Sequence, residues 1–339
     1  MTRFDRALAG EPQAVPPIWL MRQAGRYHRH YQALRRQHSF DALCRTPELA
    51  AEVARGPVEA FDFDSAILFS DLLYPLDALG LRVRYTDAGP QLDARLTPAS
   101  LARLRSLDDA AARLTFQSEA VAATRAVIPT DRGLIGFVGG PWTLFVYAVE
   151  GSHSGSLTTA KTSLPLYRRF TRRLVPLLSR AIAGQLAAGA DVVMIFDTAA
   201  GELPAREFAD HVAPDLAALA NAFPNRLGYY AKNLHPTHLA PGPLVDAPWA
   251  GFGFDWRWDL ASRLRARRAG FVQGNFDPSL LFLRGRALDR AVTAFLAPVA
   301  ALSPAERRGW ICGLGHGVLP GTPQSSVRRF VQLVRRTLR

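Results

Sequence analysis

Eight short apolar runs recur along the chain, each ending in small or polar residues, and longer amphipathic segments separate most of them. Continuous apolar runs of this length are typical of strands buried on both faces, as in a parallel sheet. The runs are PPIWLM (16–21), SAILFSD (65–71), GLIGFVGG (133–140), DVVMIFDT (191–198), RLGYYAKN (226–233), WAGFGFDW (249–256), GFVQGNFD (270–277) and GWICGLGHG (309–317). This alternation of strands and helices predicts an α/β fold, a single (β/α)8 TIM barrel. A doubly wound open sheet is the alternative, but no G-x-G-x-x-G motif follows the first run.

Helical spacing of apolar residues supports the alternation. In the segment 163–190, apolar residues recur at intervals of three and four, and Gly189 follows where a helix terminus prefers glycine. The segments 47–61 and 107–128 are also predicted to be helical. The weakest unit is 235–248, where several prolines leave room for little helix.

Length and composition fit one soluble domain. A chain of 339 residues is long for an ordinary domain but fits one large barrel, so we predict a single domain over 1–339. The first residues, MTRFDRALAG, lack the apolar stretch of a signal peptide, and no run of about eighteen apolar residues occurs. Cys44 and Cys312 form no metal-ligand motif and are too few for a disulfide framework. We therefore expect a cytoplasmic protein with no membrane partner.

The formal net charge of +12 indicates an anionic partner. Nearly all of the positive charge is arginine, because Lys161 and Lys232 are the only lysines. Most arginine clusters, such as YRRFTRR, occur on helix-like segments, where a solvated helix face is sufficient explanation. No nucleic-acid motif and no basic patch interleaved with aromatic residues appears, so nucleic acid is not expected as a partner.

Polar or small residues follow the apolar runs at the positions where a barrel carries its chemistry, the C-terminal ends of the strands. These positions are Arg22 with Arg26, Asp71, Gly139 with Gly140, Asp197 with Thr198, Asn233, Asp255, Asn275 with Asp277, and His316. Asp, Asn and Gly also end strands as ordinary turn residues, so a turn is the alternative for any one of them. Arg22, Asp71 and His316 are stronger candidates, because arginine and histidine are not preferred in turns and Asp71 is followed by apolar residues.

Two arginines bracket a glycine in the segment WLMRQAGRYHRHY. Arg22 and Arg26 would repel each other unless a multiply anionic group lies between them, and guanidinium groups bind carboxylates with two parallel hydrogen bonds. Gly25 allows the backbone to approach a ligand closely. The alternative is that both arginines pair with nearby acids such as Asp41 or Glu48.

Asp71 stands between the apolar segments SAILFS and LLYPLDALG. Burial favours the neutral form of a carboxyl group, so nearby arginines or N–H donors are needed to keep it charged. Asp71 is therefore either part of a structural ion pair or a receptor for several N–H donors of a ligand.

Two further candidates lie on loops. The segment 136–165 is a long connection, and its part WTLFVYAVEG is predicted to be a short helix that presents Tyr147, followed by a mobile SHSGS tip. The hydroxyl of Tyr147 needs a hydrogen-bond partner even if the ring belongs to the core. His316 has a glycine on each side, so helix packing does not explain it and a ligand contact or a proton role is indicated.

Several of these segments occur in the same order in a known family. PPIWLMRQAGRYHRHY is similar to the amino-terminal signature P-x-W-x-M-R-Q-A-G-R-Y of the uroporphyrinogen decarboxylases of tetrapyrrole biosynthesis. The segments SAILFSDLLYPLDALG, GFVGGPWTLFVYAVEG, FDTAAGEL, GFDWRW, QGNFDP and GLGHGVLPGTP resemble later landmarks of that family. The resemblance covers essentially the whole chain, from about Arg6 onwards.

The resemblance implies a single barrel, usually a homodimer, that uses no cofactor and no metal. It implies removal of carbon dioxide from the four acetate side chains of uroporphyrinogen III, which gives coproporphyrinogen III. The implied substrate-binding residues are Arg22, Gln23, Ala24, Gly25, Arg26, Asp71, Tyr147, Thr198 and His316. Asp71 would accept the pyrrole N–H groups at the centre of the macrocycle, and the arginine stretch would bind substrate carboxylates. Thr198 departs from members that carry serine, but the hydroxyl is kept.

The implied chemistry suits these residues. Loss of carbon dioxide needs an electron sink, and a pyrrole protonated at a ring carbon becomes a cation that can accept the electrons. A fixed carboxylate at Asp71 would stabilise that positive charge, an effect worth roughly 3–4 kcal/mol. The proton donor stays open: arginine is a poor acid, and a protonated Asp71 would no longer be a negative receptor.

Two other functions are considered. Zinc-dependent methyltransferases that act on corrinoid proteins resemble the chain near ICGLG, where Cys312 matches a zinc ligand, but their His-x-Cys ligands have no counterpart. A non-enzymatic binder of anions is the third possibility, which the positive net charge alone supports.

Overall fold

The computed structural model describes residues 1–86, 89–267 and 269–338. Contacts divide the chain into two compact units: unit 1 comprises Met1–Phe69, Ala123–Ile135 and Ala250–Arg339, and unit 2 comprises Ser70–Ala122 and Gly136–Trp249. The single domain expected over 1–339 stays a prediction. Within the described residues, no helix is both long enough and apolar enough to span a membrane.

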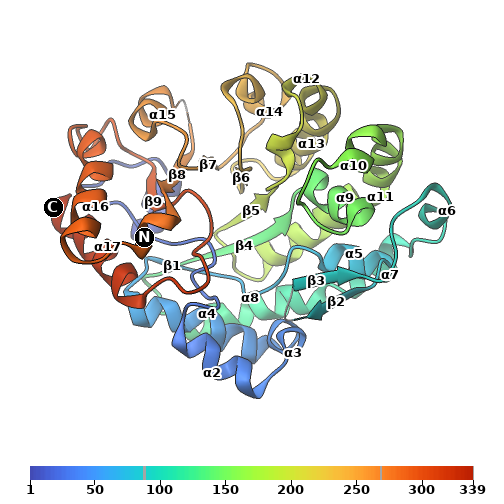
Figure 1. The fold of residues 1–339 in the computed structure, drawn as a ribbon, viewed down its shortest axis with the longest axis horizontal. Helices are drawn as coiled ribbons and strands as arrows, with labels where there is room; N and C mark the ends of the chain where they lie inside the picture. The colour runs from blue at the N-terminus through green and yellow to red at the C-terminus, as the bar shows by residue number, and fades with distance from the viewer. Residues whose placement is uncertain (87–88, 268, 339) are drawn as a thin grey trace. The chain divides into compact units, whose positions relative to one another are not determined.

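Parallel strands alternate with helices along the chain (Figure 1), so the predicted α/β barrel class is confirmed. The elements of unit 1 are α1 (Arg3–Leu8), α2 (Arg29–Gln37), α3 (Phe40–Arg45), α4 (Pro47–Phe61), β1 (Ser65–Ile67), β7 (Gly251–Gly253), α15 (Leu260–Ala266), β8 (Phe271–Phe276), η4 (Pro278–Phe282), α16 (Gly285–Ala300), β9 (Trp310–Leu314) and α17 (Gln324–Thr337). Helix α8 (Thr115–Val127) and strand β4 (Gly133–Gly139) each contribute residues to both units.

The strands of unit 1 pair in an order that joins the first apolar run to the last. Strand β1 is parallel to the start of β4, and β7, β8 and β9 are parallel neighbours. Ile18 lies between these groups: it bridges Cys312 of β9, and its carbonyl oxygen accepts a hydrogen bond of 2.9 Å from the N–H of Asp64, just before β1. The resulting order is β4, β1, Ile18, β9, β8, β7. A doubly wound sheet instead has its last strand at an edge, so that alternative is wrong.

The first predicted strand, 16–21, is reduced to one bridge residue. Pro16 and Pro17 have no N–H group to donate to a strand ladder, which limits pairing to the residues that follow. Even so, the carbonyl oxygen of Pro17 accepts a hydrogen bond from the N–H of Cys312 at 2.9 Å. The segment therefore occupies its predicted position without forming a regular strand.

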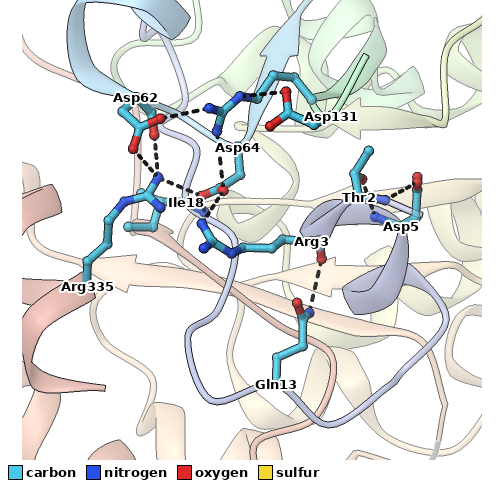
Figure 2. Close-up of polar contacts among 10 residues, drawn as sticks. Thr2, Arg3, Asp5, Gln13, Ile18, Asp62, Asp64, Asp131 and Arg335 are labelled. Carbon is cyan, nitrogen blue, oxygen red and sulfur yellow. Dashed lines mark hydrogen bonds and ion pairs between the residues drawn. The ribbon is translucent and has the colours of Figure 1, made fainter. Parts of the chain in front are cut away.

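Asp64 ties this part of unit 1 together at the N-terminal end of β1. Its carboxylate accepts the N–H of Ile18 at 2.8 Å and pairs with Arg3 and Arg335, each at 3.2 Å, and with Arg132 at 3.6 Å (Figure 2). Burial raises the pKa of Asp64, and the adjacent guanidinium groups oppose that rise. The start of the chain, the turn before β4 and the last helix are thus joined at one carboxylate.

Unit 2 has a parallel core and one antiparallel hairpin. Its elements are α5 (Tyr74–Leu79), β2 (Val83–Thr86), β3 (Gly89–Leu92), α6 (Pro98–Leu101), α7 (Leu107–Ala112), α9 (Pro141–Glu150), α10 (Thr158–Thr162), α11 (Leu164–Ala187), β5 (Val192–Phe196), η1 (Ala200–Glu202), α12 (Ala205–Glu207), the π-helical turn η2 (Phe208–Val212), α13 (Ala213–Ala222), β6 (Leu227–Tyr230), η3 (Pro236–Leu239) and α14 (Pro243–Asp246). Strands β5 and β6 are parallel. The N–H of Gly140, directly after β4, donates to the carbonyl oxygen of Phe196 in β5 at 2.8 Å.

Two of the predicted helices are confirmed and one is divided. Helix α4 matches the prediction over 47–61, and α11 falls inside 163–190. Gly189 adopts a φ of 107°, a left-handed conformation that suits glycine at a helix end. The prediction of one helix over 107–128 is wrong, because the segment forms the two helices α7 and α8. Between them, the N–H groups of Arg113 and Leu114 donate to carbonyl oxygens three residues earlier, whereas an α-helix needs a spacing of four.

The hairpin of β2 and β3 was not predicted. Its strands pair antiparallel, with Val83 opposite Leu92 and Thr86 opposite Gly89. It follows α5 and is drawn beside that helix in Figure 1. The proline-rich segment 235–248 forms only the 3-10 turn η3 and the single turn α14, as expected.

Candidate active site

Residues 22–26 form a loop in unit 1, called the arginine loop, and the side chain of Gln23 holds its shape. The side chain of Gln23 accepts the N–H of Leu20 at 3.2 Å and donates to the carbonyl oxygen of Ser65 at 3.0 Å. Gln23 itself is buried, and its carbonyl oxygen accepts the hydroxyl of Tyr27 at 2.9 Å. Its side chain therefore fixes the loop against β1, and its predicted substrate contact stays a prediction, as does that of the half-buried Ala24.

Both arginines of the loop are exposed. Arg22 has a φ of 61°, a left-handed conformation that is uncommon for arginine. Within residues 1–86, 89–267 and 269–338, neither Arg22 nor Arg26 forms an ion pair with a carboxylate, whereas Asp41 pairs with Arg45 at 2.9 Å. The alternative in which nearby acids neutralise the two arginines is therefore wrong, and both charges are available to an anionic ligand.

His316 lies on a loop that packs against the arginine loop. The N–H of Val318 donates to the carbonyl oxygen of Met21 at 2.8 Å. A Cβ atom on Gly317 would clash with the aliphatic part of the Arg22 side chain, so the two residues are in close contact. Unit 1 thus brings together Arg22 and the half-buried His316, as the sequence predicted for neighbouring strand ends.

A third arginine, Arg257, lies beside the loop that carries His316, and it was not among the predicted site residues. Arg257 pairs with the fully buried carboxylate of Asp255 at 3.0 Å, and its guanidinium lies 4.6 Å from the centre of the Trp256 ring. A Cβ atom on Gly315 would lie 2.5 Å from the backbone nitrogen of Trp256. The backbone beside Arg257 therefore packs against the loop that carries His316. The signal was the segment GFDWRW, in which an arginine follows the strand-end aspartate by two positions.

Asp71 in unit 2 is half-buried and is held by donors of the protein. Its Oδ1 atom accepts the N–H of Leu73 at 2.9 Å and the hydroxyl of Tyr85 at 3.1 Å. The first contact is an Asx-type turn that leads into α5. Tyr85 was missed because it lies on the unpredicted hairpin, although the alternation of Val83 and Tyr85 with polar residues is a strand signal.

Gly139 and Gly140 lie where the ends of two other segments of unit 2 meet. A Cβ atom on Gly139 would be 3.1 Å from the carbonyl oxygen of Leu72, the residue after Asp71. A Cβ atom on Gly140 would be 2.2 Å from the carboxyl carbon of Asp197. The chain after Asp71 and the end of β5, with the half-buried Thr198, therefore converge on the start of α9.

Asp197 is a structural residue. It is fully buried, and its Oδ1 atom accepts the N–H of Thr143 in the first turn of α9 at 2.7 Å. Burial raises the pKa of Asp197 to about 6, and hydrogen bonds from Thr143, Tyr229 and Trp142 oppose the rise. A carboxylate at a helix N-terminus is favourable for the helix dipole. Asp197 thus fixes α9 to β5, and the predicted ligand contact of its neighbour Thr198 stays a prediction.

Tyr147 is half-buried in the second half of α9. Its hydroxyl oxygen lies 2.8 Å from Nδ1 of His153 in the SHSGS segment, and the two rings are 5.3 Å apart. The hydroxyl therefore has the partner that was expected for it, and that partner is an exposed residue of the connecting loop.

Other strand-end residues serve the fold, as the turn alternative predicted. Asn233 has a φ of 64° and donates to Glu202 at 2.7 Å. Asn275 donates to the carbonyl oxygens of Asp255 and Trp258, and Asp277 accepts the N–H of Ser279 at the start of η4. None of these contacts indicates a ligand.

The family is decided by sequence. A model described as uroporphyrinogen decarboxylase matches residues 1–337. The chain belongs to the uroporphyrinogen decarboxylase family. As a member of that family it is an enzyme of the carboxy-lyase class. Uroporphyrinogen decarboxylase of Pelobacter propionicus is 35% identical, with 100% of this chain and 99% of that protein covered. The corresponding protein of Schizosaccharomyces pombe is 32% identical, with 96% and 95% covered.

Solved structures support the fold of this uroporphyrinogen decarboxylase family member. A methyltransferase from Methanosarcina mazei has a TM-score of 0.79 at 17% identity and covers 99% of each chain. A putative vitamin-B12-independent methionine synthase from Listeria monocytogenes has a TM-score of 0.55 at 11% identity, with 96% of this chain and 98% of that chain covered. At these identities the likeness concerns the fold alone.

Proposed function

We propose that the chain removes carbon dioxide from the four acetate side chains of uroporphyrinogen III and releases coproporphyrinogen III. The observation that carries this assignment is the pair of exposed arginines, Arg22 and Arg26, without a carboxylate partner in the described residues of a chain that belongs to this family. A substrate with eight carboxylates supplies the multiple negative charge that such a pair needs.

In this proposal the arginine loop binds substrate carboxylates. Arg22 and Arg26 provide the guanidinium groups, Gly25 permits close approach, and the neighbouring Ala24 and Gln23 complete the loop. His316 contacts substrate from the adjoining loop, and the hydroxyls of Tyr147 and Thr198 are further contacts. The packing of Gly317 on Arg22 supports a shared role for the two loops of unit 1.

Asp71 is assigned the central role in the chemistry. Pyrrole N–H groups donate to its carboxylate, and protonation of a ring carbon during decarboxylation places positive charge near it. The negative charge of Asp71 interacts more strongly with that cation than with the neutral ground state, which lowers the barrier. The N–H of Leu73 and the hydroxyl of Tyr85 support this role because they hold the carboxylate before substrate arrives.

We further propose that the protein is a cytoplasmic homodimer and acts without metal or cofactor. The support is the family resemblance, and sedimentation analysis of the purified protein tests the oligomeric state. A mass of one chain, 37.1 kDa, would contradict the dimer.

The assay is anaerobic conversion of uroporphyrinogen III in the presence of a metal chelator, followed by separation of the partly decarboxylated products. Asp71→Asn is expected to lower kcat by at least about a hundredfold, because the negative charge that stabilises the transition state is lost. The matched control is Asp108→Asn, an aspartate whose side chain is 86% exposed and pairs only with Arg180 among described contacts. Full activity in Asp71→Asn rejects the assigned role.

The zinc methyltransferase alternative rests on Cys312 and on a shared fold. Cys312 is fully buried, and burial raises the pKa of its thiol well above the ordinary value, which opposes the thiolate that zinc requires. In the described parts of the chain, no cluster of three or more His, Cys, Asp or Glu side chains is placed to bind a metal. Stoichiometric zinc in the purified protein, bound through Cys312, would favour the alternative.

A further inference from the structure

Residues 255–258 form a tight turn just after β7, called the Arg257 turn, and hydrogen bonds hold its backbone in place. The N–H of Trp258 donates to the carbonyl oxygen of Asp255 at 3.3 Å. The side chain of Asn275 in β8 donates to the carbonyl oxygens of both residues, at 2.9 and 2.8 Å. The N–H of Arg257 donates to the buried carboxylate of Asp255 at 2.9 Å. The turn is therefore a fixed support for the side chain of Arg257.

The guanidinium group of Arg257 is held by two contacts within the turn. Its Nη1 atom pairs with Oδ2 of Asp255 at 3.0 Å, and the group lies 4.6 Å from the centre of the Trp256 ring. Half of the Arg257 side chain, 50% by area, is nevertheless exposed. An arginine that is already held in position binds a ligand with a smaller loss of conformational entropy. Arg257 is thus both restrained and accessible to a ligand.

The Arg257 turn and the arginine loop pack on the same short segment of unit 1, residues 315–317. A Cβ atom on Gly315 would lie 2.5 Å from a backbone nitrogen of the turn, and one on Gly317 would clash with the side chain of Arg22. Consecutive Cα atoms are about 3.8 Å apart, so the Cα atoms of the two glycines are separated by no more than roughly 7 Å. The turn that carries Arg257 and the loop that carries Arg22 are therefore neighbours, and both arginines are exposed.

The proposed substrate carries four carboxylates that leave as carbon dioxide and four that remain in the product. A leaving carboxylate loses its negative charge as the reaction proceeds. An arginine bound to it would stabilise the ground state more than the transition state and would slow the reaction. A carboxylate that remains keeps its charge, so an arginine can bind it without raising the barrier. A restrained guanidinium is therefore better suited to a carboxylate of the second kind.

We infer that Arg257 is a third arginine of the substrate site and that it binds one of the carboxylates that remain in the product. This inference rests on the proposed function. The contact between Nη1 and Asp255 holds the guanidinium group, and its exposed part donates hydrogen bonds to the substrate carboxylate. The same carboxylate is present in substrate, intermediates and product, so Arg257 contributes to binding at each of the four decarboxylations.

The competing explanation is that Arg257 only neutralises the buried carboxylate of Asp255. Two variants separate the explanations. Arg257→Gln removes the charge from both roles. Arg257→Lys keeps a positive charge beside Asp255 but lacks the planar fork that binds a carboxylate with two hydrogen bonds. The matched control is Arg263→Gln, because Arg263 also lies over a tryptophan ring, that of Trp258 at 5.0 Å, and the variant removes the same charge.

Arg257→Gln is expected to raise KM for uroporphyrinogen about tenfold or more and to change kcat by less than about twofold, because the lost contact is equally strong in the ground state and the transition state. Arg257→Lys is expected to raise KM about threefold or more and to keep the melting temperature of the unmodified protein. Arg263→Gln is expected to leave KM within about twofold. Anaerobic steady-state kinetics and thermal unfolding measure these values.

Product inhibition by coproporphyrinogen provides the second readout. Because the carboxylate bound by Arg257 remains in the product, Arg257→Gln is expected to raise the inhibition constant Ki of coproporphyrinogen by about the same factor as KM. A raised KM with an unchanged Ki would mean that Arg257 contacts a leaving carboxylate, which overturns the inference.

Three further outcomes overturn it. The first is a KM for Arg257→Gln equal to that of the unmodified protein, and the second is an equal rise of KM in Arg263→Gln. The third is a rise of KM in Arg257→Gln that accompanies a lower melting temperature and is absent from Arg257→Lys, because neutralisation of Asp255 then explains the effect. Each of these, found with an unmodified protein that decarboxylates uroporphyrinogen, leaves the proposed function intact. Absence of decarboxylation by the unmodified protein rejects both.

Discussion

Asp197 directly follows β5 inside the protein, where solvent does not screen its charge. Its carboxylate accepts hydrogen bonds from the first turn of α9, and its position leaves no room for a side chain at residue 140. The charge state of the Asp197 carboxyl group is thereby linked to the position of α9. This link makes the free energy of unfolding depend on pH.

Burial raises the pKa of Asp197 from its ordinary 3.8 to about 6. Between these values the folded protein retains a proton that the unfolded chain releases. The contribution of Asp197 to the free energy of unfolding is therefore largest below about pH 4, falls as the pH rises to about 6, and is constant above that, a total change of roughly 3 kcal/mol. Urea unfolding between pH 4 and pH 7 measures it.

The matched variant is Asp197→Asn, which keeps the size of the side chain and cannot titrate. We expect the difference in unfolding free energy between the unmodified protein and Asp197→Asn to shift by roughly 3 kcal/mol in favour of the variant as the pH rises through this window. A constant difference across the window contradicts the pKa assigned to Asp197.

At the residue scale, the sequence predicted the candidate site where residue type was decisive. Arginine and histidine are uncommon in turns, so Arg22, Arg26 and His316 were predicted as site residues, and the structure places Arg22 and His316 on adjoining loops. Their contacts with substrate stay predictions. Asp197 could not be separated from Thr198 by type, because only burial shows that its carboxylate serves α9.

At the element scale, the helices that could be predicted are those in which apolar residues repeat with helical spacing. Helices α4 and α11 repeat apolar residues at three and four positions, and both were predicted within a few residues. The division between α7 and α8 carries no glycine or proline, so nothing in the sequence marked it. The β2–β3 hairpin is short and partly exposed, which gives a weak alternation, and the sequence does not indicate the contact between Tyr85 and Asp71.

Asp64 provides a prediction about how elements are joined. Asp64→Ala leaves the guanidinium groups of Arg3, Arg132 and Arg335 without this acceptor, and it also removes the partner of the Ile18 N–H. Loss of one partner from a buried charge network costs about 3–5 kcal/mol of unfolding free energy. Chemical denaturation of the purified variant measures the loss.

The control for this prediction is Asp210→Ala. Among the described residues, Asp210 forms one ion pair, with Arg206, in which both side chains are more than half exposed. Such pairs contribute about 0–1 kcal/mol. Equal losses in Asp64→Ala and Asp210→Ala would show that the buried cluster does not hold the elements together.

At the scale of the whole molecule, the formal net charge of +12 acts on the approach of an anionic substrate. Long-range attraction is screened by salt, with a Debye length of about 10 Å at 0.1 M. We expect kcat/KM for uroporphyrinogen to fall about tenfold or more between roughly 0.02 and 0.5 M salt, and kcat to change little, because salt weakens encounter rather than chemistry. Steady-state kinetics over this range test it.

Two arginine variants separate general attraction from binding at the loop. Arg22→Gln and Arg172→Gln each lower the net charge by one unit, but Arg172 lies on the exposed face of α11. Arg22→Gln is expected to raise KM strongly, and Arg172→Gln only slightly. Similar effects of the two variants would indicate that no specific carboxylate contact exists at Arg22.

Ile18 lies against Cys312, a residue near the other end of the chain. During translation Cys312 is added long after Ile18, so the bridge between them and the contact of Val318 with Met21 form late in synthesis. The nascent chain therefore carries an unfinished edge beside β1 for most of its synthesis. Contacts between such distant segments slow folding, and binding by a chaperone at this edge is one means of protecting it.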